Sequence, residues 1–456
     1  MRNLMILLMA LSLTACSIGP DYVRPETAKH EAWRAQYQAA EGVIDSAWWK
    51  QFGDSELDRL VQSALRENLD IKIAAARVDQ YLGALNSTRS QYFPQISSNL
   101  NGGGGRQSGV NSESYSATLN ASWELDLWGK VRRSSEAANA QLLGSEAGRR
   151  GALLSLVSSV ATGYITLRAY DRKLEIARET SKAYSDSLNL FKLRFRYGTV
   201  SQLQVSQAES EYEKAHQSEI SLESSISQQE NLLSILLGQA PGPIARGKSL
   251  EQLTPPAIPA GLPSKLLERR PDIIQAEQTL VAANAQIGVA KAAYFPAISL
   301  TAALGVASQD LGKLFAAGTG IWSLAGTAAT PILTFGSLSG KVKQAEAQQQ
   351  QALFQYQQAV LNSFREVDDA LVKTTKGREQ VASQRAQVKA LQDYSRLARL
   401  QFEAGTANYL QVLDADRSLF SGQLDLVQGQ VDTLNAIVSV YKTMGGGWID
   451  VAGSMK

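Results

Sequence analysis

The segment Tyr92-Phe93-Pro94-Gln95-Ile96-Ser97 recurs as Tyr294-Phe295-Pro296-Ala297-Ile298-Ser299, 202 residues later (294 minus 92). Three further pairs of segments match in the same order, at offsets of 202 or 207. They are 68–71 with 270–273, 128–129 with 335–336, and 195–199 with 402–406. Four ordered matches predict a tandem duplication. The first copy spans about 57–240 and the second about 262–445, and a Pro- and Gly-rich linker at 241–261 joins them.

Two very long helices are predicted in each copy. No proline occurs between Gly129 and Tyr197 or between Gly336 and Glu403, and apolar residues recur there at spacings of three and four. About 69 residues at about 1.5 Å each make a helix on the order of 100 Å long. Such helices imply coiled-coil packing. The expected long helices are 129–197, 201–237, 336–403 and 408–444, with one shorter helix opening each copy.

The last helix carries two apolar seams, one through Leu413, Val427 and Leu434 and one through Ala415 and Val440. A helix with two seams has a neighbour on each flank. This predicts that the helix is one of several that stand side by side in the wall of a helical barrel. On periodicity alone, an ordinary two-stranded coiled coil or a helical bundle stays open.

Segments that alternate at period two lie between the helices. In 115–127 every odd residue is apolar or small and every even one is polar. Strands are expected at about 93–102, 113–127, 295–307 and 320–333, with loops at 102–111 and 308–320. The run Gly102-Gly103-Gly104-Gly105 is read as part of a flexible loop, because the Lys-Ser/Thr and helix of a phosphate-binding loop are missing.

The length and the ends of these strands fit a membrane. About ten residues match a transmembrane β-strand. Aromatic residues cluster at the strand ends, as an interfacial girdle requires: Tyr92, Phe93, Trp123, Trp128, Tyr294, Phe295, Trp322 and Phe335. Period two alone equally fits a soluble, half-buried sheet.

Four strands cannot close a barrel, and an open sheet edge in hydrocarbon leaves backbone groups unpaired at several kcal/mol each. Other copies of the same chain must therefore complete the sheet, and cyclic symmetry is the usual solution. Three copies give twelve strands, enough for a pore. Two copies would give eight, whose interior the side chains fill.

The N-terminus reads as an export signal. Arg2 precedes an apolar run at 4–13, and Leu13-Thr14-Ala15-Cys16 resembles the cleavage site of a bacterial lipoprotein. This predicts a signal peptide at 1–15, a covalent lipid on Cys16, and an N-terminal anchor segment at 16–56, placing the protein in the Gram-negative envelope. The alternative is an ordinary signal peptide with a buried free cysteine.

The composition excludes several function classes. The 45 Lys and Arg nearly balance the 43 Asp and Glu, which argues against nucleic acid as the main partner. The chain has one Cys and two His, and His30 and His216 form no metal-ligand spacing. No nucleophile stands beside a His in a recognisable catalytic motif. Neither an enzyme, a metal site nor another cofactor is expected.

Several motifs together carry a family resemblance. They are the start Cys16-Ser17-Ile18-Gly19-Pro20-Asp21-Tyr22, the segment Trp48-Trp49-Lys50-Gln51-Phe52, the Tyr-Phe-Pro repeats, the segment Trp123-Glu124-Leu125-Asp126-Leu127-Trp128-Gly129-Lys130, and Gly405-Thr406 followed by Asp414-Ala415. With these the chain resembles the TolC-like outer-membrane efflux proteins, in particular the lipoprotein (NodT-type) branch that serves resistance-nodulation-division pumps.

The resemblance implies an α+β membrane protein of the outer membrane that extends into the periplasm. Three copies would form a twelve-stranded β-barrel, with four strands from each chain, continuing into a twelve-helix periplasmic α-barrel. The Trp48-Trp49 segment and the stretches flanking the linker would form an equatorial belt. A periplasmic adaptor would contact the helix tips, and an inner-membrane transporter would supply substrate. The tip residues are Tyr197, Gly198, Thr199, Ala404, Gly405 and Thr406.

The family narrows its tunnel near the periplasmic tips with acidic residues, which maps a gate onto Asp414, with Asp416 and Arg417 beside it and Phe402 nearby. The matching first-copy position is the neutral Gln207, so the ring would come from the second copy alone. The alternatives are that both aspartates are solvated charges near a helix N-terminus and that Phe402 is plain seam packing. Gly198 and Gly405 are also expected to be left-handed helix caps.

The function expected from this resemblance is a passive exit duct for small toxic compounds or drugs. Two other functions stay open: a duct of the same fold for secreted protein or metal ions, and a lipid-anchored coiled-coil tether without a pore.

Overall fold

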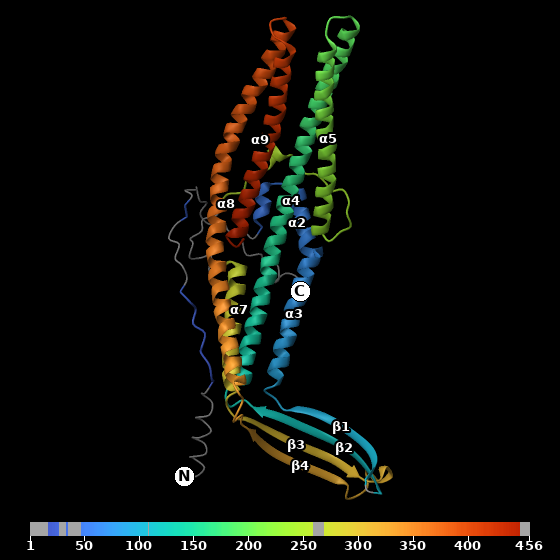
Figure 1. The fold of residues 1–456 in the computed structure, drawn as a ribbon, viewed down its shortest axis with the longest axis vertical. Helices are drawn as coiled ribbons and strands as arrows, with labels where there is room; N and C mark the ends of the chain where they lie inside the picture. Colours follow the sequence, from blue (N-terminus) through green and yellow to red (C-terminus); the bar gives the residue numbers. More distant parts are fainter. Residues whose placement is uncertain (1–16, 27–32, 35–46, 108, 259–268, 447–456) are drawn as a thin grey trace. The chain divides into compact units, whose positions relative to one another are not determined.

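The computed structural model describes residues 17–26, 33–34, 47–107, 109–258 and 269–446. The expected signal peptide, Cys16 and nearly all of the expected C-terminal tail at 446–456 lie outside these residues. The chain divides into two compact units (Figure 1). Unit 1 comprises 1–28, 75–148 and 272–359, and unit 2 comprises 29–74, 149–271 and 360–456. Each unit therefore takes residues from both copies of the duplication.

Seven α-helices occur in the described residues, and most of these residues lie in them. They are α2 (Ser55–Glu67), α3 (Leu69–Ser90), α4 (Lys130–Arg196), α5 (Gln202–Leu236), α7 (Pro271–Ala292), α8 (Ser337–Glu403) and α9 (Tyr409–Thr443). Short 3-10 turns lie at η1 (Trp48–Phe52), η2 (Leu250–Gln252) and η3 (Leu311–Lys313). The four long helices begin and end within one residue of the positions predicted from sequence.

Equivalent glycines begin and end the long helices of the two copies. Gly129 before α4 and Gly336 before α8 have φ of +78° and +87°. Gly238 after α5 and Gly445 after α9 have φ of +69° and +89°. Only glycine adopts this region at little cost, so the duplicated glycines set the helix boundaries.

In unit 2, α9 lies between α4 and α8, as its two seams predict. Val427, Val431 and Leu434 share a buried cluster with side chains of α4. On the other flank α8 approaches so closely that a Cβ on Gly422 would lie 2.8 Å from Leu391 Cδ1, and one on Gly429 would lie 2.1 Å from Gln384 Oε1. The small residues of the second seam therefore allow α8 to pack closely against α9.

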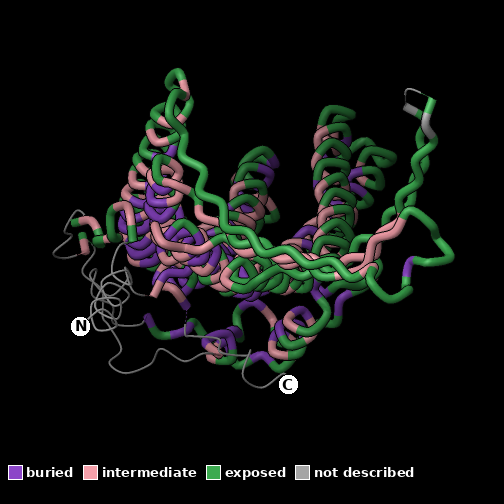
Figure 2. The backbone as a smooth tube through the Cα atoms, turned by 90° about the horizontal axis from the view of Figure 1, so that it is seen from below, coloured by how far each residue is buried: buried purple, intermediate pink, exposed green. Residues whose placement is uncertain are grey.

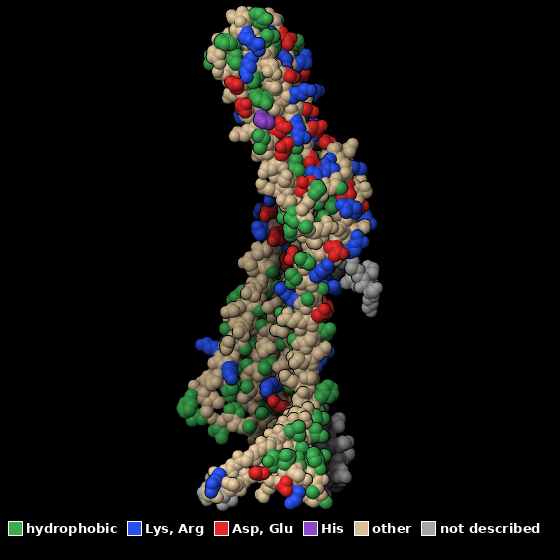
Figure 3. Space-filling view, turned by 90° about the vertical axis from the view of Figure 1, so that its right-hand side faces the viewer, with side chains coloured by type: hydrophobic (Ala, Val, Ile, Leu, Met, Phe, Trp, Pro, Cys, Tyr) green, Lys and Arg blue, Asp and Glu red, His purple; other side chains and the backbone are tan. Residues whose placement is uncertain are grey.

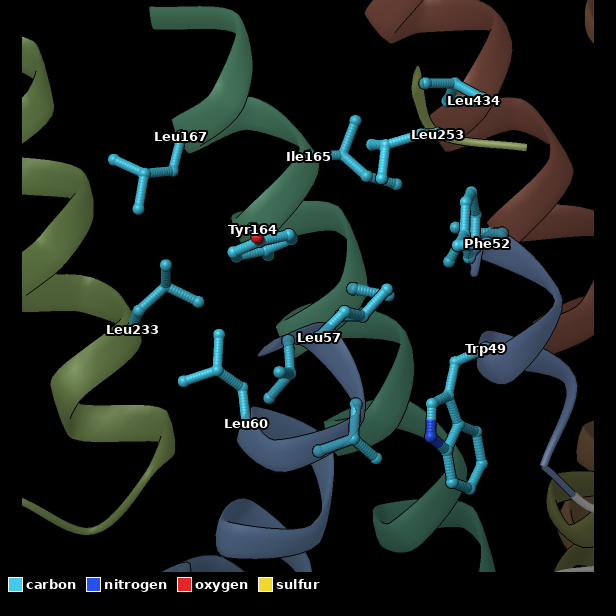
Figure 4. Packing of buried hydrophobic residues seen from close by; sticks show 14 of the residues in the cluster. Trp49, Phe52, Leu57, Leu60, Tyr164, Ile165, Leu167, Leu233, Leu253 and Leu434 are labelled. Atoms are coloured by element: carbon cyan, nitrogen blue, oxygen red, sulfur yellow. The ribbon is translucent and has the colours of Figure 1, made fainter. Parts of the chain in front are cut away.

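The main core of unit 2 joins α2, α4, α5 and α9 (Figure 4). Trp48 is fully buried and stacks on Tyr441 of α9 with ring centroids 5.0 Å apart. Figure 4 shows Leu57, Leu60, Tyr164 and Leu233 converging from three helices. An apolar stretch of α4 is long enough to cross a membrane by length and composition, but 61% of it is buried inside the protein. It is accordingly a core segment of the helix, and Figure 2 shows buried residues along the helices.

A buried carboxylate ties the linker to this core. Asp54 is 3% exposed and caps α2 by accepting from Glu56 N at 2.8 Å. Its other oxygen accepts from Tyr164 Oη at 2.9 Å and from Lys248 N at 2.8 Å. Burial, followed by the neighbouring Asp54, raises the pKa of Tyr164, so the phenol stays a donor. A Cβ at Gly247 would lie 2.1 Å from Asp54 Oδ1, so only glycine fits there.

Replacing Asp54 with Ala is expected to lower the free energy of unfolding by about 3 kcal/mol, because it leaves buried donors of Tyr164 and Lys248 unpaired. The midpoint of thermal unfolding should fall by roughly 3 °C, measured by circular dichroism. Asp70, exposed in the first turn of α3, gives the matched control Asp70→Ala. Equal midpoints for the two variants would refute the role of Asp54.

Unit 1 contains an antiparallel sheet in the order β1-β2-β3-β4 (Figure 1). The strands are β1 (Gln95–Gln107), β2 (Val110–Leu125), β3 (Ala297–Ser308) and β4 (Gly320–Ala329). Strands β2 and β3 come from different copies, so the central pairing joins the two halves of the duplication. The outer edges of β1 and β4 have no partner strand among the described residues.

The register gives the sheet one apolar and one polar face. Leu119 pairs with Leu304, Ala121 with Ala302, and Trp123 with Leu300. On the opposite face Ser122 pairs with Thr301. Side chains of the apolar face are exposed in the single chain, among them Leu100 (82%), Trp322 (79%) and Leu324 (74%). In Figure 3 Lys, Arg, Asp and Glu are dense over the helices of unit 2 and sparse over the sheet. An exposed apolar face of this kind marks an interaction surface.

Two sequence expectations about the sheet were wrong in detail. The segment 102–111 was expected to be a loop, but Gly102 to Gly105 lie in β1 and pair with Tyr115 to Ser112. Pairing with β2 sustains this ladder, and Tyr115 covers Gly102, with its Cδ1 atom 3.2 Å from the position of a Cβ. The fourth strand was expected to reach 333 but ends at Ala329, because Pro331 cannot donate to a ladder.

Candidate functional site at the helix tips

The α4–α5 turn is closed by a left-handed glycine. Gly198 has φ +70° and its N–H donates to Phe195 O at 2.9 Å, while Thr199 N donates to Arg194 O at 3.0 Å. This bond pair is the Schellman helix cap. The Thr199 hydroxyl donates to the same Arg194 carbonyl, and Ser201 then begins α5 with a capping box.

The α8–α9 turn repeats this geometry. Gly405 has φ +75° and donates to Phe402 O at 3.0 Å, and Thr406 N donates to Gln401 O at 2.9 Å. The Thr406 hydroxyl also donates to Gln401 O. Nothing lies within 4 Å of a Cβ built on either glycine, so the backbone conformation alone requires glycine. Both tips leave their outer surface open, and Tyr197 is 78% exposed.

An aromatic cluster joins the two helical hairpins below the tips. Phe191 of α4 lies 4.2 Å from Tyr409 and 6.3 Å from Phe402, measured between ring centroids. Phe191 and Tyr409 are buried, and Phe402 is half-buried against them. The structure therefore places Phe402 in interhelical packing.

Two aspartates of α9 are tied to α8 beside this cluster. Tyr394 Oη donates to Asp414 Oδ2 at 3.1 Å. Asp416 accepts from Ser395 Oγ and from Arg399 Nη2, the latter at 2.9 Å. The Asp416 side chain is only 12% exposed, so this ion pair is better shielded from water than a surface pair.

The next residue links α9 to the other hairpin. Arg417 Nη1 lies 3.6 Å from Glu211 Oε1 of α5, and Arg417 Nε donates to Leu413 O at 3.3 Å. Asp416 and Arg417, adjacent in sequence, thus reach α8 and α5 respectively. The helical hairpins are cross-linked by charge at this level.

Asp414 and Asp416 raise the pKa values of nearby tyrosine hydroxyls. The hydrogen bond to Asp414 raises the pKa of Tyr394. Burial, followed by the charge of Asp416, raises the pKa of Tyr409 to about 12. Burial and the same charge raise the pKa of Tyr184, whose hydroxyl is buried with no hydrogen-bond partner in the described part of the chain. The three phenols are therefore neutral at physiological pH.

The structure brings Asp414, Asp416, Arg417 and Phe402 into one layer just below the tips, whose turns hold Tyr197, Gly198, Thr199, Gly405 and Thr406. Sequence reasoning missed the partners of the aspartates, namely Tyr394, Ser395, Arg399 and Glu211. The only sequence signal was that Tyr394 and Arg399 precede the turn on the same helix. Within the described residues, no group of three or more His, Cys, Asp or Glu could hold a metal ion.

Comparison with known proteins places this geometry in a family. The family model described as "Outer membrane efflux protein" matches the chain twice, at 60–239 and 262–446. The toluene efflux pump outer membrane protein TtgC of Pseudomonas putida is 38% identical over 470 residues, covering 98% of this chain and 96% of TtgC. The cation efflux system protein CusC of Escherichia coli is 33% identical, covering 96% and 97%.

A solved structure agrees with these matches. The open state of the MtrE outer membrane channel of Neisseria gonorrhoeae superposes with a TM-score of 0.86 at 31% identity, covering 95% of this chain and 99% of MtrE. The predicted TolC-like resemblance, outer-membrane location and fold class are confirmed: the chain has the fold of trimeric channels whose strands and helices form consecutive barrels. The double match also confirms the duplication. The chain belongs to the outer membrane efflux protein family.

Proposed function

We propose that this chain is the passive exit duct of a tripartite efflux pump for small toxic organic compounds. A periplasmic adaptor and an inner-membrane transporter of the resistance-nodulation-division class would complete the pump. The apolar face of the sheet would meet lipid and the polar face water, because alternate residues of a barrel strand face opposite sides. TtgC, whose name cites toluene, supports this cargo class.

The periplasmic end of the duct would be gated by the layer below the tips. The observation that carries this proposal is that Asp414 and Asp416 of α9 are held by Tyr394, Ser395 and Arg399 of α8. In a trimer, three such layers would ring the tunnel where the helices converge. A carboxylate ring attracts cations, and the bonds to α8 would resist outward movement of α9. Opening would require breaking them.

The tips themselves would dock the adaptor. Tyr197, Gly198 and Thr199 on one turn, and Gly405 and Thr406 on the other, present the same backbone outline. Because no atom lies within 4 Å of a Cβ built on Gly198 or Gly405, a partner can approach the backbone of each turn directly. Two tips per chain would give six docking points for the adaptor in a trimer.

The transported cargo distinguishes this proposal from the two alternatives of the same fold, a duct for secreted protein and a duct for metal ions. A deletion strain should become more sensitive to organic solvents and drugs, and complementation with the wild-type chain should reverse this. CusC, the relative whose name cites cations, makes metal sensitivity the comparison assay. A deletion strain sensitive only to metal salts, or defective only in protein secretion, would overturn the proposed cargo class.

We also propose that Cys16 carries a lipid and that this lipid is secondary to barrel closure. Cys16→Ala, expressed with a signal peptide that does not require lipidation, is expected to yield trimers at about the wild-type level, because sheet closure in lipid satisfies the strand edges. Size-exclusion chromatography with light scattering in detergent measures this, with intact mass showing whether wild-type Cys16 is acylated. Recovery of monomers alone from the variant would contradict the prediction.

A further inference from the structure

The segment just after Cys16 is seated on both copies of the duplication. Residues 17–24 lie across α4 of the first copy and α7 of the second. Ile18 N donates to Trp128 O at 3.2 Å, and Asn284 Nδ2 donates to Pro20 O at 2.9 Å. Farther along, Tyr22 Oη donates to Glu277 Oε1 at 3.1 Å, and Arg24 pairs with the same carboxylate at 2.9 Å.

A buried guanidinium holds this segment. The side chain of Arg133 is only 6% exposed. It donates to Ile18 O at 3.4 Å, to Gly19 O at 3.3 Å and to Asp21 Oδ1 at 2.7 Å, and on its own helix to Glu136 at 2.8 Å. Three of these four acceptors belong to the segment. Without it, buried N–H donors of Arg133 would lack partners, which is costly for a charged group.

Glycines open the space that the segment fills. A Cβ on Gly19, whose φ is +110°, would lie 2.5 Å from Gly288 Cα. A Cβ on Gly288 would lie 2.7 Å from Ile18 O, and one on Gly129 would lie 2.9 Å from Ser17 Oγ. Gly129 and Gly288, from two other parts of the chain, and Gly19 within the segment therefore allow a close fit. This is a surface shaped for a defined occupant.

The segment 17–24 contacts unit 1 at the junction between its strands and its helices. Trp128 Nε1 donates to Pro296 O at 2.7 Å, and the Trp128 ring lies 4.9 Å from that of Phe295. The motif Trp128-Gly129 of one copy thus meets the Tyr-Phe-Pro motif of the other. Residue 17 lies against this junction.

We infer that residues 17–24 form a clamp that joins the two repeats at the root of the sheet and fixes the position of the preceding lipid-bearing residue there. The clamp stands on contacts within unit 1, and only its role in placing the lipid rests on the proposed acylation of Cys16. A lipid on the residue before Ser17 would in consequence be attached next to the aromatic junction.

Hydrogen exchange on the full trimer tests the clamp. Arg133→Met removes the guanidinium and keeps the aliphatic stem. Gly288→Val keeps the guanidinium and fills the groove, where a Cβ would lie 2.7 Å from both Ile18 O and Arg133 Cγ. In both, a peptide spanning 17–24 is expected to exchange at least about tenfold faster, since losing charged hydrogen bonds changes an equilibrium by about that factor or more. The strand peptides should keep their wild-type rates.

Lys130→Met is the matched control, because Lys130 lies in the same helical turn but pairs with the exposed Glu124 and does not touch the segment. Wild-type rates at 17–24 in both test variants, or an equal increase in Lys130→Met, would overturn the clamp. If Arg133→Met yields no trimer, Gly288→Val and Asp21→Asn decide, the latter altering a carboxylate that is 90% exposed.

Cys16→Ala separates the clamp from the lipid. The clamp predicts that residues 17–24 stay slow to exchange in this unacylated trimer. If residues 17–24 exchange slowly and the mass of the wild-type protein shows no lipid, acylation of Cys16 is rejected. The clamp is then still supported. Exchange as fast as in Arg133→Met would show that the lipid holds the segment, and would overturn the clamp.

Discussion

Replacing Asp414 and Asp416 together with Ala is expected to raise the single-channel conductance in planar bilayers by severalfold, on the order of two to five times. The double change removes the acceptors for Tyr394, Ser395 and Arg399, so that α9 loses these three side-chain hydrogen bonds to α8. It also removes two carboxylates per chain from the proposed constriction. Conductance should therefore rise while cation preference falls.

A second variant separates the two causes. Tyr394→Phe combined with Arg399→Met removes donors but keeps both carboxylates. If the interhelical bonds hold the gate, this variant should also conduct more, with cation preference retained. Asp393→Ala is the control, because Asp393 pairs with Arg396 on its own helix. Conductance equal to wild type in both test variants would refute a gating role for Asp414 and Asp416.

Replacing Gly305 with Val is expected to abolish barrel formation. Gly305 lies in the central strand β3, where a Cβ would be 2.1 Å from Ala117 O and 2.7 Å from Thr118 Cα of β2. Both are backbone atoms of the paired strand, so no side chain can move aside and the strands must separate. We expect the amount of trimer in the outer-membrane fraction to fall at least about tenfold, as for overpacking that the backbone cannot relieve.

Gly326→Val is the matched control for this change. Gly326 lies in β4, where the nearest atom to a Cβ is Leu300 Cδ2 at 3.5 Å, an ordinary contact. That variant should assemble normally, as judged by immunoblot of membrane fractions and by bilayer current. Normal assembly of Gly305→Val would refute the register of β2 and β3.

The long helices were predictable because their signals are local. An unbroken seam without proline defines each helix, and Gly198 and Gly405 mark where α4 and α8 stop. Cap geometry needs only neighbouring residues. The duplication added a check, because each boundary in one copy recurs in the other.

The strand ends were less predictable. The run from Gly102 to Gly105 has low strand propensity, yet it continues β1 because the partner strand supplies a ladder. Pairing of this kind depends on residues distant in sequence. The end of β4 near Pro331 was available as a local signal but was outweighed by the alternating pattern.

The site was half predictable. Motif matching located Asp414 and Asp416, but their partners on α8 follow from how α8 and α9 are aligned, which depends on close approach at Gly422 and Gly429. The clamp was beyond sequence reasoning for the same reason. Arg133 contacts Asp21, 112 positions away, and nothing local marks that contact.

We propose that one chain supplies only part of a closed duct, which three copies complete. Native mass spectrometry of the mature protein released from detergent micelles tests it most directly. We expect three copies as the dominant species, and bilayer current from the same preparation. A single chain that stays soluble and monomeric after detergent is removed would contradict it.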